Sequence, residues 1–314
     1  MISGFQTVRD SAIALTLRVL AAKPAVANAA WHIDPEELAD VTIRWPQTYQ
    51  WPQARIWIDS LISGFKARAR VAVTELEQPY PGIVLFEFGK SNRRMSVVID
   101  YSDYPEINLQ AADQCEVYFK MQHLREGYGR ANVLPGGYVC DARRLYLHLE
   151  RLRQLRDRRA FKFDVYGRFS TEFAYEVRSK AFDLLAMQNA FQFEGGLRKV
   201  KYLDFLKELA QAKVCIDLPG QGDFCFRLIN YLAIGACIVG PRPRTVLHMP
   251  LRDRVHIAYT KDDFSDLVDV CRFYLEDDRA REEMCRESRR FFEAYLHKDN
   301  LTSYYLRCCL DRLN

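Results

Sequence analysis

The chain has 314 residues, which is enough for two domains, since single hydrophobic cores rarely grow beyond about 250 residues. Hydrophobic residues make up 49% and charged residues 27% of the sequence, as in ordinary globular proteins, which excludes a disordered or collagen-like chain. The net charge of +4 is smaller than that of a dedicated nucleic-acid-binding protein and argues against that class.

The N-terminal segment is the first element in chain order. Residues 5–20 predict an amphipathic helix, and residues 25–30 (AVANAA) resemble a signal-peptidase site. Arg18 and Lys23 interrupt the apolar run, however, and no stretch reaches the roughly 18 apolar residues of a membrane span. We expect neither secretion nor a membrane span.

The first half of the chain has the mixed pattern of an α/β domain. A helical spacing of apolar residues predicts a helix over residues 54–65. Short apolar segments predict strands over residues 70–74, 82–88, 95–100, 116–120 and 132–134. We take residues 1–140 as the first domain.

A run of arginines follows this domain. Seven arginines lie between residues 143 and 159, with few acids among them. We interpret residues 141–160 as a helix that connects two domains and turns a charged face to solvent. The alternative is a surface that touches an anionic membrane or an acidic acceptor.

Strands and helices alternate regularly in the second half. Strands are predicted over residues 161–166, 190–193, 214–218, 236–240 and 255–259, and helices over residues 171–188, 202–212, 224–234 and 264–275. This alternation predicts a parallel sheet covered by helices on both faces, over residues 161–295. The tail over residues 279–313 is predicted to be helical, so residues 296–314 could cross back to brace the first domain. The predicted fold class is α/β, with two Rossmann-like domains that face a central cleft.

Nine cysteines occur, none of them in the first 114 residues and no two with the CxxC spacing of a zinc ribbon. Cys215, Cys237 and Cys271 lie in apolar stretches, as small hydrophobic side chains do in a reduced compartment. We therefore predict free thiols and a cytoplasmic protein.

Ligands of open α/β sheets bind at the carboxyl ends of the strands, which selects a few residues as candidates. Arg168 follows one predicted strand, and residues 219–223 (PGQGD) follow another directly ahead of a helix. Gly220 and Gly222 would let the backbone approach a ligand, and Asp223 would cap the helix.

The exposed N–H groups of that helix end suit a diphosphate, with Arg227 one turn further in and Arg168 as a second cation. Alternatively, the segment is a tight turn with structural glycines. The dinucleotide fingerprint and the Walker pattern are both absent.

The segment from residue 212 to 241, AKVCIDLPGQGDFCFRLINYLAIGACIVGP, resembles the donor-binding segment of two-domain B-fold glycosyltransferases, especially the exostosin-like group. That group carries a Pro-Gly-x-Gly loop and then a helix with Arg-x-x-Glu-Ala-Leu-x-x-Gly. Arg227, Leu232 and Gly235 match in order, whereas Asn230 stands where the family has an acidic residue that binds the ribose.

Two further segments extend the resemblance upstream. They are VYGR (165–168), at the start of the C-terminal domain, and EVYFKMQH (116–123), near the end of the N-terminal one. The resemblance implies a transferase that moves a sugar from a nucleotide-sugar donor, UDP or GDP sugar, to a glycan or glycoconjugate acceptor. Gly220, Gln221, Gly222, Asp223 and Asn230 would bind the donor together with Arg168 and Arg227, and no other cofactor is expected.

Enzymes of this fold usually need no metal, which agrees with the absence of an Asp-x-Asp motif. An inverting enzyme needs a general base from the N-terminal domain. Asp103, Asp100 and His123 follow strand ends and are the candidates, while Lys120 could assist with the phosphates. Asp103 could instead cap a turn, and His123 could be a surface histidine.

Three rival functions remain open. A nucleotide-sugar epimerase of the same architecture would convert the donor alone. A non-catalytic nucleotide-sugar- or glycan-binding protein stays open because Asn230 replaces the acidic residue of the family. A sugar transferase acting on nucleic acid would use the arginine run, against which the modest net charge argues. Peripheral contact with a membrane surface is a further possibility for the cytoplasmic protein.

Overall fold

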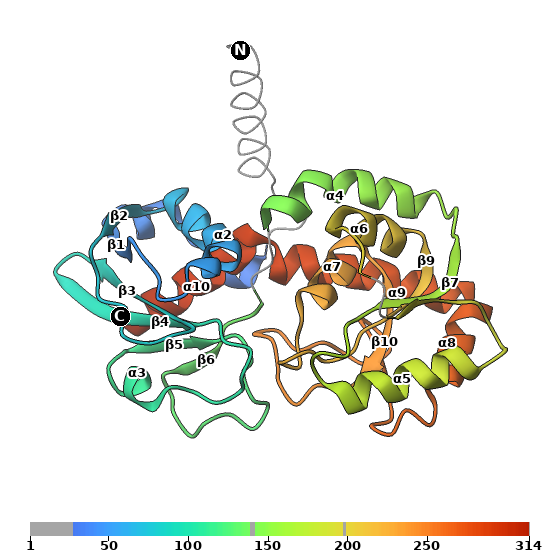
Figure 1. The fold of residues 1–314 in the computed structure, drawn as a ribbon. Helices are drawn as coiled ribbons and strands as arrows, with labels where there is room; N and C mark the ends of the chain where they lie inside the picture. Colours follow the sequence, from blue (N-terminus) through green and yellow to red (C-terminus); the bar gives the residue numbers. More distant parts are fainter. Residues whose placement is uncertain (1–27, 139–141, 197–198, 314) are drawn as a thin grey trace, which may run out of the picture.

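The computed structural model describes residues 28–138, 142–196 and 199–313 (Figure 1). The predicted helix over residues 5–20 lies outside this range, as do residues 25–27 of the AVANAA segment. Within the described residues, no helix is both long and apolar enough to cross a membrane.

The first sheet is mixed and has the strand order β2-β1-β3-β4-β5-β6. β1 pairs antiparallel with β3, and β3 antiparallel with β4, whereas the other neighbours are parallel. Only two residues, Ser91 and Asn92, separate β3 from β4, and Ser91 has the positive φ of 54° that such tight hairpins require. The strands are β1 (Val41–Pro46), β2 (Arg70–Thr74), β3 (Ile83–Lys90), β4 (Arg93–Asp100), β5 (Val117–Lys120) and β6 (Val133–Pro135).

Helices cover both faces of this sheet. α2 (Arg55–Lys66) and α10 (Lys298–Leu313) pack against each other on one face, and α3 (Leu109–Asp113) lies on the other. Ile58, Leu61 and Phe65 are buried in α2 at helical spacing, so that one stripe of the helix faces the sheet.

The second sheet is entirely parallel and has the order β11-β10-β9-β7-β8. α4 (Ala142–Asp157), α6 (Tyr202–Ala210) and α7 (Phe226–Ile234) lie over one face, and α5 (Tyr175–Met187) and α8 (Leu267–Glu276) over the other (Figure 1). Burial on both faces explains the continuous apolar runs of these strands. The strands are β7 (Phe163–Arg168), β8 (Phe193–Gly196), β9 (Ala212–Ile216), β10 (Cys237–Pro241) and β11 (Ala258–Thr260).

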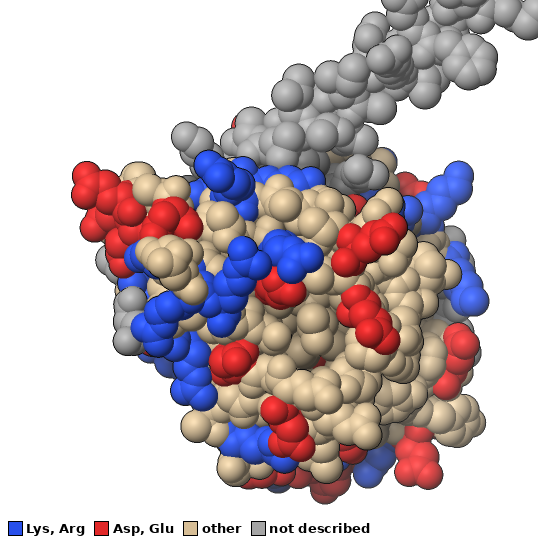
Figure 2. Space-filling view, turned by 90° about the vertical axis from the view of Figure 1, so that its left-hand side faces the viewer, with Lys and Arg blue, Asp and Glu red and all other residues tan. Residues whose placement is uncertain are grey.

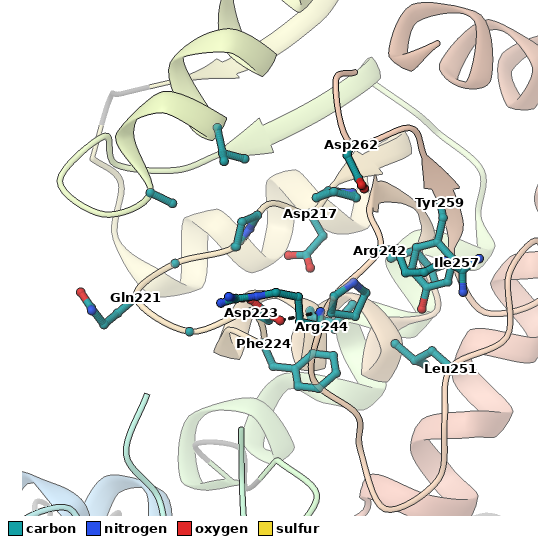
Figure 3. Close-up of a pocket in the computed structure, with 18 of the residues that line it drawn as sticks. Asp217, Gln221, Asp223, Phe224, Arg242, Arg244, Leu251, Ile257, Tyr259 and Asp262 are labelled. Carbon is teal, nitrogen blue, oxygen red and sulfur yellow. Dashed lines mark hydrogen bonds and ion pairs between the residues drawn. The ribbon is translucent and has the colours of Figure 1, made fainter. Parts of the chain in front are cut away.

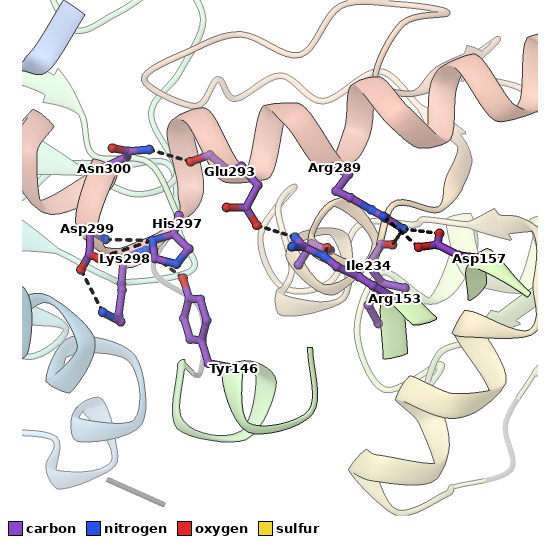
Figure 4. Close-up of polar contacts among 11 residues, drawn as sticks. Tyr146, Arg153, Asp157, Ile234, Arg289, Glu293, His297, Lys298, Asp299 and Asn300 are labelled. Carbon is purple, nitrogen blue, oxygen red and sulfur yellow. Dashed lines mark hydrogen bonds and ion pairs between the residues drawn. The ribbon is translucent and has the colours of Figure 1, made fainter. Parts of the chain in front are cut away.

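The C-terminal helices connect the two sheets. α9 (Asp278–Phe291) packs on the second sheet, a π-helical turn covers Phe292–Leu296, and α10 then lies on the first sheet. Arg153 of α4 is fastened to this turn through Glu293, with 2.6 Å between Nη2 and Oε1 (Figure 4). The Tyr146 hydroxyl accepts the backbone N–H of Lys298 at 2.8 Å. α4 thus holds the crossing point between α9 and α10.

The arginine run therefore differs from a solvated helix face. Arg153 and Arg156 point into the protein, where Arg156 is buried and donates to the Ala212 carbonyl at 2.8 Å. Arg159 forms an exposed pair with Glu282 at 2.8 Å. The sequence pattern did not distinguish these arginines from one another.

The predicted fold class is confirmed: two sheets with parallel pairings and covering helices form two α/β halves. β1 was missed, although Val41, Ile43 and Trp45 alternate with more exposed residues in the way a half-buried strand requires. The antiparallel pairings of β3 were also not predicted. Eight cysteines in the described ranges are free thiols, and Cys215, Cys237 and Cys271 are buried as predicted.

Candidate functional site

The second sheet reverses its strand order between β7 and β9, because β8 lies on one side of β7 and β9 on the other. In parallel sheets the crevice at such a switch point is where ligands bind, at the carboxyl ends of the strands. Two cavities open at this edge of the sheet, one on each side of the switch point.

The glycine-loop cavity has a volume of about 560 Å³ and lies at the carboxyl ends of β9, β10 and β11 (Figure 3). Its lining includes the loop over residues 219–223, Asp217, Arg242, Arg244 and Tyr259. Figure 3 shows Asp217 and Asp223 with Arg242 and Arg244 around one hollow, so that acids and arginines face each other there. Arg242 lies over the Tyr259 ring, with 4.3 Å from its guanidinium carbon to the ring centroid.

The Arg168 cavity has a volume of about 350 Å³ and lies at the carboxyl ends of β7 and β8. Among the described residues that line it, the charged ones are Arg168, Lys199 and Arg227, and none is acidic. Phe169, Tyr202, Phe205 and Phe226 add aromatic surface. A cationic lining with aromatic side chains suits a ligand that has both an anionic group and a flat ring.

Arg227 occupies the switch point itself. Its Nε lies 3.2 Å from Asp217 Oδ1, its Nη1 donates to the Arg168 carbonyl at 3.4 Å, and its Nη2 donates to the Leu218 carbonyl. The last two partners lie at the ends of β7 and β9. The side chains of Arg227 and Asp217 are 6% and 9% exposed, so the pair forms the wall between the two cavities. Burial raises the pKa of Asp217 to about 6, although Arg227 acts to lower it.

Asp217 was not among the predicted site residues. It is the aspartate of the VCIDL segment, directly after β9, and the same strand-end rule that selected Arg168 applies to it. A carboxylate in an otherwise apolar strand segment was the signal that could have identified it.

The loop over residues 219–223 is packed against the first half of the protein. A Cβ atom on Gly222 would lie 2.6 Å from the Asp103 carbonyl oxygen and would also collide with Gln122. A Cβ on Gly220 would lie 2.7 Å from Cys225 Sγ. Protein atoms thus crowd both positions, which gives the glycines a structural role, as in the alternative of a tight turn. Both glycines also line the glycine-loop cavity, so a ligand could still approach their backbone.

The prediction that Asp223 caps the following helix is wrong. α7 begins at Phe226 with Cys225 as its N-cap, so Asp223 lies too early in the chain to reach the free N–H groups. Its Oδ2 instead accepts the backbone N–H groups of Arg244 and Thr245, at 2.6 and 3.0 Å. Asp223 thus fixes the segment after β10 beside the loop.

Arg168 and Asn230 are both engaged with protein groups. Arg168 pairs with Glu194 at 2.6 Å and with Glu208 at 2.8 Å. Asn230 is 2% exposed, its Oδ1 accepts the Tyr202 hydroxyl at 3.0 Å, and its Nδ2 has no hydrogen-bond partner among the described residues. Tyr202 lines the Arg168 cavity, so Asn230 lies behind it.

A third cavity, the Asp103 cavity, lies between the two halves and has a volume of about 660 Å³. It is lined from the first half by Asp100, Ser102, Asp103, Tyr104 and Glu106, and from the second half by Phe173 and Gln221. Gln221 lines the glycine-loop cavity as well. The two cavities therefore adjoin at the loop that carries Gln221.

Asp103 and Asp100 differ sharply in this cavity. Asp103 is exposed, and its side chain has no hydrogen bond or ion pair among the described residues. Nearby protein atoms partly shield its carboxylate from water, which raises the pKa of Asp103. Asp100 is 2% exposed, and its carboxylate accepts from the Tyr118 hydroxyl at 2.6 Å, Ser102 Oγ at 2.6 Å and Lys120 Nζ at 2.9 Å. The Asp103 carboxylate is thus available to a ligand, whereas the Asp100 carboxylate is already bonded to Tyr118, Ser102 and Lys120.

His123 lines none of these three cavities. Burial lowers the pKa of its imidazole, whose ring meets the Tyr128 ring edge-on with 5.1 Å between centroids. Its backbone carbonyl accepts the N–H of Val246 at 2.7 Å. His123 therefore belongs to the junction between the halves.

Gln122 joins the two halves directly and was not predicted. Its Nε2 donates to the Phe224 carbonyl at 2.8 Å, and its Oε1 accepts the Phe224 N–H at 3.1 Å. The amide thus satisfies both backbone groups of Phe224, as a neighbouring strand would, and holds the glycine loop against the first half. No local sequence signal marks a contact across 102 residues.

The fold and its cavities define a two-sheet α/β protein whose ligand site lies at the switch point of the second sheet. The chain belongs to the glycosyl transferase-like family, whose profile matches residues 143–304. The match covers the whole second sheet with Asp217, Arg227 and both cavities beside them. No curated protein matches the chain. Family membership supports a glycosyl transfer function, and with it a sugar donor and an acceptor in general.

Proposed function

We propose that the protein transfers a sugar from a nucleotide-sugar donor, a UDP or GDP sugar, to a hydroxyl of a glycan or glycoconjugate, without a metal ion. The observation that carries this proposal is the position of Arg227 at the switch point, between a cationic aromatic cavity and the glycine loop. Such a site suits a ligand with a base, a diphosphate and a sugar in a row.

Each cavity suits one part of the donor. The nucleoside would lie in the Arg168 cavity against Tyr202 and Lys199. The diphosphate would follow at the amino end of α7, where no side chain caps the first turn and the helix dipole favours an anion. The sugar would reach the glycine-loop cavity, where Asp217 can accept its hydroxyls.

Asp103 is our candidate for the general base, since it is free and its backbone contacts the glycine loop. The acceptor oxygen would attack the anomeric carbon while the bond from that carbon to the diphosphate oxygen breaks. The acceptor proton passes to Asp103, and the nucleoside diphosphate leaves. The raised pKa of Asp103 makes it a stronger base than an ordinary aspartate. Asp103→Asn should reduce kcat for an inverting enzyme and leave nucleotide binding unchanged.

The first test is thermal stabilisation by UDP, GDP, CMP, ADP and dTDP. A ligand at 100 times its dissociation constant stabilises the native state by about 2.7 kcal/mol, a readily measured shift. Lys199→Ala should weaken the response, because Lys199 is exposed in the Arg168 cavity. Lys162→Ala is the matched control, since Lys162 is exposed just ahead of β7, at the opposite end of the strand from Arg168.

Three outcomes favour a rival function. If no nucleotide stabilises the protein, the glycine loop is structural and the non-catalytic binding protein becomes the better proposal. If donor alone is converted to a second nucleotide sugar, the protein is an epimerase. If EDTA abolishes transfer, metal independence is incorrect.

Asp217 should make nucleotide binding depend on pH. Because the pKa of Asp217 is raised to about 6, its carboxylate is ionised at pH 7.5 and partly protonated at pH 5.5. Protonation removes the charge that neutralises Arg227, so a nucleoside diphosphate should bind several-fold more tightly at pH 5.5. Calorimetry at both pH values on wild type and Asp217→Asn isolates the effect, since the phosphate's own titration is common to both proteins.

The same group affects stability with a definite sign. The folded pKa of about 6 lies above the ordinary value of 3.8, so the folded protein holds this proton more tightly than the unfolded chain. The contribution of Asp217 to stability is therefore fully present below pH 3.8 and is lost as the pH rises through about 6. Wild type and Asp217→Asn should differ in the pH dependence of their melting temperatures over this interval.

A further inference from the structure

The Asp103 cavity has a lining of one sign. Among the described residues that line it, Asp100, Asp103 and Glu106 are acidic, and there is no lysine, arginine or histidine. Lys120 bears on Asp103 and Glu106 electrostatically, but it is fully buried and already paired with Asp100 at 2.9 Å. Two exposed carboxylates, Asp103 and Glu106, therefore remain without a partner of opposite charge in direct contact.

Aromatic side chains surround these carboxylates. Trp51, Tyr104 and Phe173 line the cavity and are 44%, 56% and 43% exposed, so their rings are accessible to a ligand. The Trp51 ring lies nearly parallel to that of Tyr101, with 6.0 Å between centroids and 18° between planes. The Trp51 face is thus backed by a second ring.

This combination selects for one class of ligand. Flat aromatic faces favour the C–H surface of a sugar ring, and ionised carboxylates only accept hydrogen bonds, which sugar hydroxyls and ammonium groups can donate. A phosphate or carboxylate would meet two like charges and no cation in the lining, which is a repulsive element against anionic ligands. The described lining of the Arg168 cavity on the other half holds three basic side chains and no acid, and of these Arg168 and Arg227 are paired with acids outside the lining.

The outer face of the first half carries charged side chains of both signs. In Figure 2, Lys and Arg side chains adjoin one another across part of this face, and Asp and Glu side chains lie beside them. None of the arginines in the described part of α4 lines the Asp103 cavity.

We infer that the Asp103 cavity binds the acceptor as a saccharide without negative charge, stacked on Trp51 and Tyr104 with its hydroxyls donated to Asp103 and Glu106. This inference rests on the proposed function only in calling the saccharide the acceptor. Glu106 determines specificity through its charge, and the contact of Asp103 with Gly222 places the cavity next to the donor loop.

The test measures binding of three series of p-nitrophenyl glycosides by saturation-transfer NMR, without any nucleotide. The gluco, galacto and manno series each compare the neutral glycoside with its uronide, in which a carboxylate replaces the C6 hydroxymethyl group. In at least one series the neutral glycoside should bind, and its uronide should bind about tenfold more weakly. A tenfold difference corresponds to ~1.4 kcal/mol, which is the size expected for one contact between like charges. Glu106→Gln should narrow this difference and Glu106→Lys should reverse it.

The control variants separate binding in this cavity from binding elsewhere. Tyr104→Ala should abolish the response, whereas Tyr175→Ala, which removes another exposed tyrosine outside the cavity, should preserve it. Equal or tighter binding of the uronides, no binding in any series, or a response that survives Tyr104→Ala would each overturn the inference. Binding of neutral glycosides without any nucleotide binding would support the inference and reject the proposed function, so the two fail separately.

Discussion

Replacing Lys120 with methionine is expected to lower the unfolding free energy by about 3–5 kcal/mol, the usual cost of breaking a buried ion pair from one side. Lys120 is fully buried at the end of β5, and its cross-strand partner Asp100 ends β4. Methionine fills a similar volume, so the loss would come from the charge left on Asp100 and not from a cavity. Urea unfolding followed by circular dichroism measures the change.

The double variant Lys120→Met/Asp100→Asn separates charge from packing. The single amide oxygen of asparagine could still accept one of the two hydrogen bonds that Ser102 and Tyr118 donate to the two oxygens of Asp100, and the side chain would carry no charge. The double variant should therefore be more stable than Lys120→Met alone. Asp100 of this pair lines the Asp103 cavity. Binding of neutral glycosides by Lys120→Met should therefore weaken as the folded fraction of the variant falls. A Lys120→Met protein as stable as wild type would show that Asp100 is not held as a buried ion.

The sequence predicted most of the second half because each local signal there agrees with the fold. Strands buried on both faces read as apolar runs, and the strand-end rule placed Arg168 and residues 219–223 at one edge of the sheet, where the structure has them. Arg227 was selected because it lies one turn into the helix that follows this loop and because it matches the motif of the family that the segment resembles. These features follow from periodicity and from the direction of parallel strands, which are local or nearly local properties.

The choice of partner could not be predicted in the same way. Aspartate is a residue type that often caps helices, and Asp223 directly precedes the predicted helix. α7 starts two residues later than the pattern indicates, however, and Asp223 accepts hydrogen bonds from the backbone of Arg244 and Thr245 instead. Gln122 looks like an ordinary polar residue after a strand, and only its contact with Phe224 shows its role. Similarly, Asp100 and Asp103 look equivalent in sequence, but the buried Lys120 forms an ion pair with Asp100 and none with Asp103.

Replacing Arg227 with methionine is expected to affect both stability and nucleotide binding. The variant leaves the Asp217 carboxylate buried without its cation, which should lower the unfolding free energy at pH 7.5 by about 3 kcal/mol or more. The loss should be smaller at pH 5.5, because the pKa of Asp217 is already raised to about 6 and would rise further without Arg227. Thermal melting at the two pH values checks the direction.

The double variant Arg227→Met/Asp217→Asn tests whether Arg227 acts on the ligand or only on the fold. Removing both charges should recover part of the lost stability, since no unpaired ion remains, although the bonds from Arg227 to the Leu218 and Arg168 carbonyls stay broken. Nucleoside diphosphate binding should not recover, because the cation at the switch point is absent in both variants. If the double variant instead binds the nucleotide as wild type does, Arg227 is a structural clamp between β7 and β9. The diphosphate would then be held by Arg242 and Arg244 on the other side of the glycine loop, where both side chains are exposed to the cavity.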